Sequence, residues 1–257
     1  MSHPSQPLEV FPPPPGFRSP VTSVHREGTY EFYGPASTSG LTVSASDFIL
    51  KHCAADKDGL VRALSSFLDD AAAHARQQAS STDQERSTHS TWLCVRITAP
   101  TDAWAIPRWH RDGRMFDCMC AAPRPHAKYA MTLLGPPTRM LWPSETVDAA
   151  VRKVEAQHSG LGMGENDYSY ESEEKERAGL AEALEEIPLV ELQTGQVVRF
   201  TWGESDAPVH SEPDSSAEAR LFLSVMFGSE AELRDMCSIR DEVYGEESTW
   251  TSQKSLE

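Results

Sequence analysis

His110 and Asp112 are separated by a single residue, and Gly113 follows them directly. Imidazole nitrogens and carboxylate oxygens are the atoms with which proteins commonly hold divalent transition metals. A pair at positions i and i+2 suits this role where a strand runs out into a turn, because both side chains can then converge on one ion. A later histidine, His210, could complete a set of two imidazoles and one carboxylate.

Spacing within such a pair does not single out a site. The chain has nine histidines and 39 acidic residues, and His-x-acid pairs also occur at His25 with Glu27 and at His210 with Glu212. Each of these histidines, taken alone, is typical of a surface or loop residue. The order of the segments around His110 is what distinguishes it from the others.

The segments in question are WHRDG at 109–113, KYAMTLLGPPTRMLW at 128–142, GQVVRFTW at 195–202, His210, Arg220 and RLFLSVMF at 220–227. Their order resembles that of the iron(II)- and 2-oxoglutarate-dependent oxygenase superfamily, and the resemblance covers roughly residues 91–228. By this resemblance His110, Asp112 and His210 bind Fe(II) and form the catalytic group. Arg220 would bind the far carboxylate of the cosubstrate 2-oxoglutarate, a role that suits its planar, permanently charged fork.

The activity that the resemblance implies is that of a dioxygenase. It would hydroxylate an unknown small-molecule or protein substrate and release succinate and carbon dioxide. A second anchor for 2-oxoglutarate would be Tyr129 or Thr132, and the sequence does not choose between them. The long interval between Asp112 and His210 departs from the family pattern, although an acidic insertion accounts for much of it.

Two other functions use the same residues. A cupin-like binding or scaffold protein would have the same barrel without iron chemistry. A zinc-dependent hydrolase would use the two histidines and Asp112 together with a general base, for which Glu212 is the candidate. The presence of Arg220 ten residues after His210 favours the oxygenase. The chain has no GxSxG elbow, P-loop or dinucleotide-binding fingerprint.

Hydrophobic periodicity predicts the elements that must position these residues. Apolar residues at three- and four-residue intervals predict an amphipathic helix over 58–78, with Asp56 and Asp58 available to cap its start. Strands are predicted at 91–98, 128–134, 138–142, 189–192, 196–202 and 220–227, and further helices at 145–157 and 230–243. The expected fold class is mainly β with flanking helices (α+β), in the form of a double-stranded β-helix or jelly roll.

Composition divides the chain further. Residues 1–40 hold eight of the 18 prolines and are predicted to be a disordered segment, with Pro12 to Pro15 as an alternative ligand for an SH3- or WW-type domain. Residues 41–245 would form one jelly-roll domain. An acidic insertion at about 158–187 is predicted to be flexible, with helical character near 178–186, and 246–257 would be a flexible tail.

Charge and cysteine content exclude some functions. The net charge of -16 disfavours binding to nucleic acid or to an anionic membrane, since both depend on clustered Lys and Arg. No apolar run approaches the roughly 20 residues that span a bilayer, and the N-terminus does not read as a secretion signal. The expected compartment is the cytoplasm or the nucleus. The five cysteines are predicted to be free thiols, with Cys118 and Cys120 as a buried pair.

Overall fold

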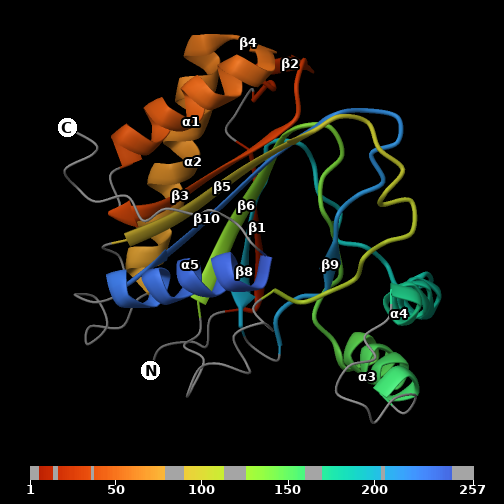
Figure 1. Cartoon of the computed structure of the whole chain (residues 1–257). Coiled ribbons are helices and arrows are strands. Elements are labelled where there is room, and N and C mark those ends of the chain that lie inside the picture. The colour runs from red at the N-terminus through yellow and green to blue at the C-terminus, as the bar shows by residue number, and fades with distance from the viewer. Residues whose placement is uncertain are drawn as a thin grey trace.

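A six-stranded antiparallel sheet forms the centre of the fold (Figure 1). The computed structural model describes residues 6–13, 17–35, 38–78, 90–112, 126–159, 170–203 and 206–244. In spatial order the strands of this main sheet are β1 (Leu8–Phe11), β8 (Val197–Trp202), β6 (His126–Leu134), β10 (Arg220–Gly228), β5 (Ser90–Thr98) and β3 (Gly28–Pro35). The strands predicted at 91–98, 128–134, 196–202 and 220–227 are therefore confirmed.

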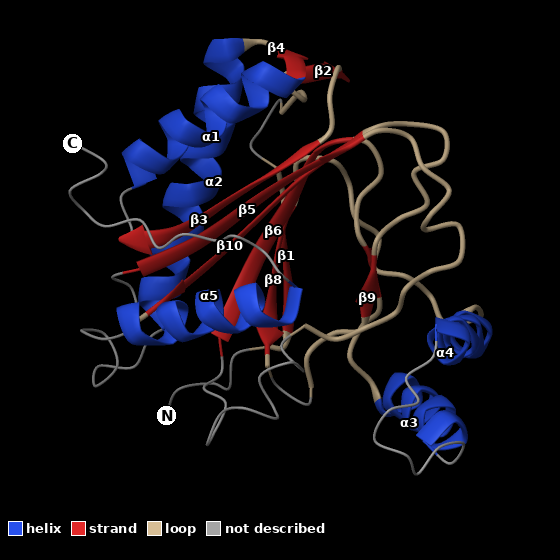
Figure 2. Cartoon of the chain, in the orientation of Figure 1, coloured by secondary structure: helices blue, strands red, loops and turns tan. Residues whose placement is uncertain are grey.

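Helices α1 (Thr38–His52) and α2 (Lys57–Gln78) cover one face of the main sheet (Figure 2). The α2 side chains expected from the apolar spacing, including Leu60, Leu64 and Phe67, are buried in one cluster with alternate residues of β5, β6 and β10. At the start of α2 the backbone amide of Gly59 donates to the Asp56 carboxylate at 3.1 Å, as a capping residue requires. Beside these helices β2 (Val21–Val24) pairs with β4 (Cys53–Ala55).

A second, smaller array of short pairings lies opposite the other face of the sheet. Its members are β7 (Arg139–Met140), which pairs with β9 (His210–Ser211), an isolated pairing of His110 with His210, and another of Leu141 with Leu189. A buried cluster joins this array to the main sheet and consists of Leu8, Ala130, Met140, Val190, Val198 and Phe200. Between β5 and β10 the chain passes repeatedly from the main sheet to this array and back.

The remaining helices lie outside these layers. α3 (Glu145–Ser159) and α4 (Tyr170–Leu184) pack on each other and on the array, through a buried cluster that includes Trp109, Leu141, Val151 and Leu184. α5 (Glu230–Tyr244) packs its Leu233 and Met236 on residues of β3, β5 and β10. The helices predicted at 145–157 and 230–243 are confirmed.

The prediction of a disordered segment over residues 1–40 is wrong for the part that the structure describes. This part includes β1, β2 and β3, and Leu8 is buried between the main sheet and the array. The prolines lie at the limits of these strands: Pro12 follows β1, Pro20 precedes β2 and Pro35 ends β3. At the limit of a strand the sheet does not need a backbone N–H donor, which proline lacks. A proline-rich composition is therefore compatible with short strands.

The acidic insertion is also more regular than its composition predicts. Within it, residues 170–184 form α4, on which Leu180 and Leu184 are buried against α3 while Glu173, Glu174 and Glu182 are exposed. Two apolar residues one helical turn apart are enough to attach a highly charged helix by one side. The helical character expected near 178–186 is thus confirmed, and the predicted strand at 189–192 is reduced to the pairing of Leu189.

At the level of fold class, the expected α+β chain with a large antiparallel sheet is confirmed. Cys53, Cys94 and Cys237 are buried thiols outside disulfide bonds, as predicted. Cys118, Cys120 and the expected tail at 246–257 lie outside the described residues. None of the helices in the described ranges is both long and apolar enough to cross a membrane.

Candidate metal centre

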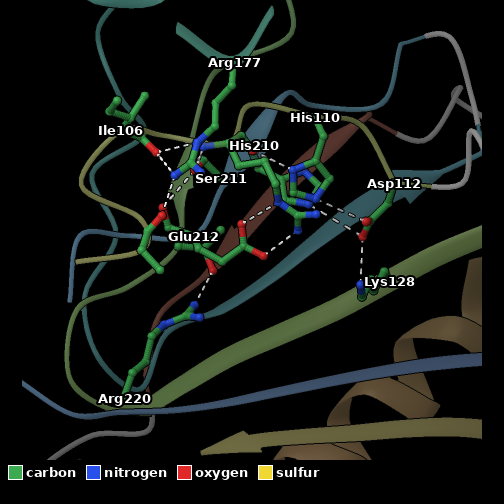
Figure 3. Close-up of polar contacts among 12 residues, drawn as sticks. Ile106, His110, Asp112, Lys128, Arg177, His210, Ser211, Glu212 and Arg220 are labelled. Carbon is green, nitrogen blue, oxygen red and sulfur yellow. Dashed lines mark hydrogen bonds and ion pairs between the residues drawn. The ribbon is translucent and has the colours of Figure 1, made fainter. Parts of the chain in front are cut away.

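The second array brings together the three residues predicted to bind a metal (Figure 3). The amide of His110 donates to the carbonyl of His210 at 2.9 Å, and the amide of His210 donates back to the carbonyl of His110 at 3.0 Å. This pairing sets the two imidazole rings 4.4 Å apart between centroids. With the carboxylate of Asp112, they offer three ligand atoms that all lie within 4.8 Å of one another.

Both imidazoles are held in the same way by the backbone. The Nδ1 of His110 lies 2.8 Å from the carbonyl oxygen of Arg108, and the Nδ1 of His210 lies 3.1 Å from that of Pro208. A carbonyl oxygen can only accept, so Nδ1 carries the proton in each ring. The Nε2 lone pairs are left for a metal. The two Nε2 atoms face the carboxylate of Asp112, at 3.7 Å from Oδ1 and 3.6 Å from Oδ2 respectively.

The surroundings favour the protonation states that a metal requires. Burial, followed by the neighbouring His210, lowers the pKa of His110 to about 4, so this imidazole is neutral at pH 7. Burial by itself raises the pKa of Asp112, but the adjacent Lys128 ammonium lowers it more, and that pKa lies well below its usual value. A neutral imidazole and an ionised carboxylate are the forms that bind metals.

Lys128 is a residue of this site that the sequence reasoning missed. It comes from β6, and its Nζ donates to Oδ2 of Asp112 at 2.7 Å. Its ammonium also lies 5.1 Å from the centre of the Trp92 ring. The signal for its position was the alternation of β6, in which Tyr129 and Met131 face the helices, whereas Lys128 and Ala130 belong to the opposite face.

The arginines near the histidines are bound to other groups. Arg108 donates to both carboxylate oxygens of Glu212, at 2.7 and 3.3 Å. Although burial raises the pKa of Glu212, Arg108 lowers it to about 2. Arg111, the residue between the two ligands, turns away from them to the carboxylate of Asp148 on α3 and to the carbonyl of Ala207. Glu212 is therefore anchored in an ion pair rather than free to act as a base.

Arg220 is buried at the start of β10. Its Nε donates to the carbonyl of Pro136 at 3.0 Å, and its Nη2 donates to the hydroxyl of Thr138 at 2.8 Å. Burial lowers its pKa to about 10, which leaves it charged at pH 7. In Figure 3 it lies apart from the three ligand residues, on the far side of Glu212.

Of the two residues considered as a second anchor, Tyr129 is directed away from the centre. It faces α2, where its hydroxyl lies 2.9 Å from Nδ1 of His74. Thr132 is three residues further along β6 and therefore lies on the opposite face, the one that carries Lys128. Strand alternation thus leaves Thr132 as the candidate.

Scans of this sequence against models of known protein families and against curated proteins found no match. The chemistry of the site consequently rests on its own geometry. The imidazoles of His110 and His210 and the ionised carboxylate of Asp112, all oriented toward one another, fit a divalent transition-metal ion. His110, Asp112 and His210 could hold such an ion.

Proposed function

We propose that this protein is an iron(II)- and 2-oxoglutarate-dependent dioxygenase that hydroxylates a small-molecule or protein substrate with release of succinate and carbon dioxide. The observation that carries the proposal is the convergence of His110, Asp112 and His210, from two distant parts of the chain, into one group. The group consists of two imidazoles and one carboxylate. Such a set leaves coordination positions open for a cosubstrate and oxygen.

The path of the chain supports a double-stranded β-helix, the fold that this function implies. From β5 the chain passes to His110 in the second array, to β6 in the main sheet, to β7 and Leu189 in the array, and to β8. It then returns to β9 in the array and ends in β10. Repeated alternation between two sheets is what a double-sheet roll requires, and here it places the two histidine segments side by side.

The roles proposed for the residues follow from their contacts. His110, Asp112 and His210 would hold the iron, which supplies the activation of oxygen when bound. The carbonyls of Arg108 and Pro208 keep the two Nε2 atoms free for it. Phe200, whose ring lies 5.2 Å from that of His210, helps to exclude water. Arg220 would bind the far carboxylate of 2-oxoglutarate, since its guanidinium is buried and charged.

The other functions considered have weaker support. A zinc-dependent hydrolase would need a free general base, whereas the Glu212 carboxylate is bound by Arg108 at two points. A cupin-like binding protein would have no need of a buried Arg220. We further propose a cytoplasmic or nuclear location and no partnership with nucleic acid or membrane, in keeping with the net charge of -16. The Pro12 to Pro15 run remains a proposed ligand for an SH3- or WW-type domain.

Anaerobic titration of the purified metal-free protein with iron(II) and 2-oxoglutarate tests the proposal. We expect a weak visible charge-transfer band that needs both additions and disappears in His110→Ala. In Arg220→Ala the affinity for 2-oxoglutarate should fall by about tenfold or more, the loss of a hydrogen bond to a charged group. Arg152→Ala, which removes an exposed arginine paired with Glu145, is the matched control. Absence of both the band and tight iron binding in the unaltered protein would refute the proposed function.

A further inference from the structure

The ion pair between Lys128 and Asp112 changes the charge of the candidate metal centre. Asp112 contributes one negative charge, and Lys128 contributes one positive charge at 2.7 Å from its Oδ2. A dication that enters the centre therefore meets a carboxylate whose charge is already balanced. It also comes close to an ammonium that repels it.

Lys128 is held in this position by its surroundings. Only 12% of its side chain is exposed, and its ammonium lies over the ring of Trp92 at 5.1 Å from the ring centre. Its backbone is paired on both sides, with Met226 of β10 and Phe200 of β8. With so little freedom, the ammonium remains next to the metal position when a cation arrives.

The same contact affects how Asp112 can bind a metal. Lys128 occupies Oδ2, whereas Oδ1 faces Nε2 of His110 at 3.7 Å and is left for the ion. A carboxylate that binds through one oxygen uses one coordination position instead of two. The position that this frees is available to a chelating ligand. A negative charge on that ligand would be attracted by both the metal and Lys128, which lies beside Asp112 in Figure 3.

We propose that Lys128 couples metal binding to the binding of an anionic chelator: it weakens binding of the metal ion alone and strengthens binding of the metal together with a dianion. This inference rests on the proposed metal centre. It assigns Lys128 as a positioning residue. Coupling between two sites of this kind is reciprocal, so the metal must raise the affinity for the anion by the same factor.

The test is an anaerobic titration with cobalt(II), whose visible absorption reports coordination, with and without saturating oxalate. In the unaltered protein we expect oxalate to raise the cobalt affinity by roughly 10- to 100-fold, within the usual range of coupling. Lys128→Met, which keeps most of the side-chain volume without the charge, should bind cobalt alone about tenfold more tightly, and the effect of oxalate should fall to a few-fold. Lys128→Arg, which keeps the positive charge, should retain the effect of oxalate on the cobalt affinity.

Controls distinguish a failure of this inference from a failure of the proposed function. Arg152→Met removes an exposed positive charge on α3 and should change neither affinity. Lys128→Gln provides a second uncharged variant if Lys128→Met does not fold, as judged by circular dichroism. If oxalate acts equally on the unaltered and uncharged proteins, the role of Lys128 is refuted and the metal centre stands. If no protein binds cobalt in any condition, the metal centre itself is refuted.

Discussion

At the scale of single residues, the candidate centre depends on short-range backbone contacts made by its histidines. His110 and His210 each bind the carbonyl two residues earlier, which orients both rings without a further side chain. The burial that accompanies this arrangement keeps His110 neutral. A neutral, oriented imidazole can bind a metal without first losing a proton. In the metal-free protein, however, the same burial makes the free energy of unfolding decrease at acid pH.

This sensitivity can be measured as the pH dependence of the free energy of unfolding. The pKa of His110 is about 4 in the folded protein against an ordinary 6.5, so between these values the unfolded chain binds the proton that the folded one excludes. Stability attributable to His110 is complete above pH 6.5 and is lost as the pH falls toward 4. Urea unfolding of the metal-free protein across this range should show a smaller slope in His110→Asn, which can still donate to the Arg108 carbonyl. Equal slopes in the two proteins would contradict the lowered pKa.

At the scale of elements, the centre is held between layers that pack independently on its two sides. α2 supports the main sheet from the helical face, while α3 and α4 support the second array from outside. Arg177 of α4 adds a specific link, because its guanidinium donates to the carbonyls of Ala103 and Ile106 in the segment before His110 and lies over Trp104. The helix within the acidic insertion thus fixes a loop that leads into the centre.

Removal of this link should loosen the loop. In Arg177→Met we expect faster amide hydrogen exchange over residues 101–109, since three donor contacts to its carbonyls are lost. The effect on global stability should stay within about 1–2 kcal/mol, because Arg177 is partly exposed to solvent. Hydrogen exchange followed by mass spectrometry provides the measurement. Exchange in α2, on the other side of the sheet, serves as the internal reference and should remain unchanged.

Packing of α2 on the main sheet should dominate the stability of the molecule. Leu64 is fully buried among residues of α2 and the sheet, so Leu64→Ala should lower the free energy of unfolding by about 2–5 kcal/mol. Val43 lies on α1 and is 59% exposed, so Val43→Ala should change the free energy of unfolding by less than about 0.5 kcal/mol. Urea unfolding measures both variants. Similar losses in the two would contradict the assignment of the buried face.

At the scale of the whole molecule, the edge of the main sheet near the second array is closed by the N-terminal strand. β1 pairs with β8, and Leu8 joins the buried cluster between the sheet and the array. Gln6 and Pro7 add backbone acceptors for Arg199 and Thr201. A segment whose composition is that of a solvated tail is therefore part of the core that supports the centre.

Deletion of residues 1–13 tests whether this segment is part of the core or a solvated tail. Loss of β1 would expose the edge of β8 and remove Leu8 from the cluster, so we expect a lower urea midpoint and increased self-association. Leu8→Ala should cost about 2–5 kcal/mol in the full-length chain. Denaturation and light scattering measure these effects. An unchanged midpoint after deletion would support a solvated tail instead.

Local pattern was sufficient for the elements whose residues repeat at a regular interval. α2, β5, β6, β8 and β10 were each predictable, because helix and strand periods are properties of neighbouring residues. The order of His110, Asp112 and His210 along the chain also indicated one metal centre, and their proximity supports it. Charge and composition were less reliable, since they led to a disordered head and a flexible insertion where β1 and α4 are found.

Three-dimensional packing was needed for everything that depends on residues far apart in sequence. The exchange of backbone hydrogen bonds between His110 and His210, the contact of Lys128 with Asp112 and the burial of Leu8 all arise when distant segments meet. The orientation of Tyr129 toward α2 became clear only from the position of that helix on the sheet. Sequence spacing indicates which residues could bind a metal. The charge, protonation and orientation of their side chains depend on neighbours that only folding brings close.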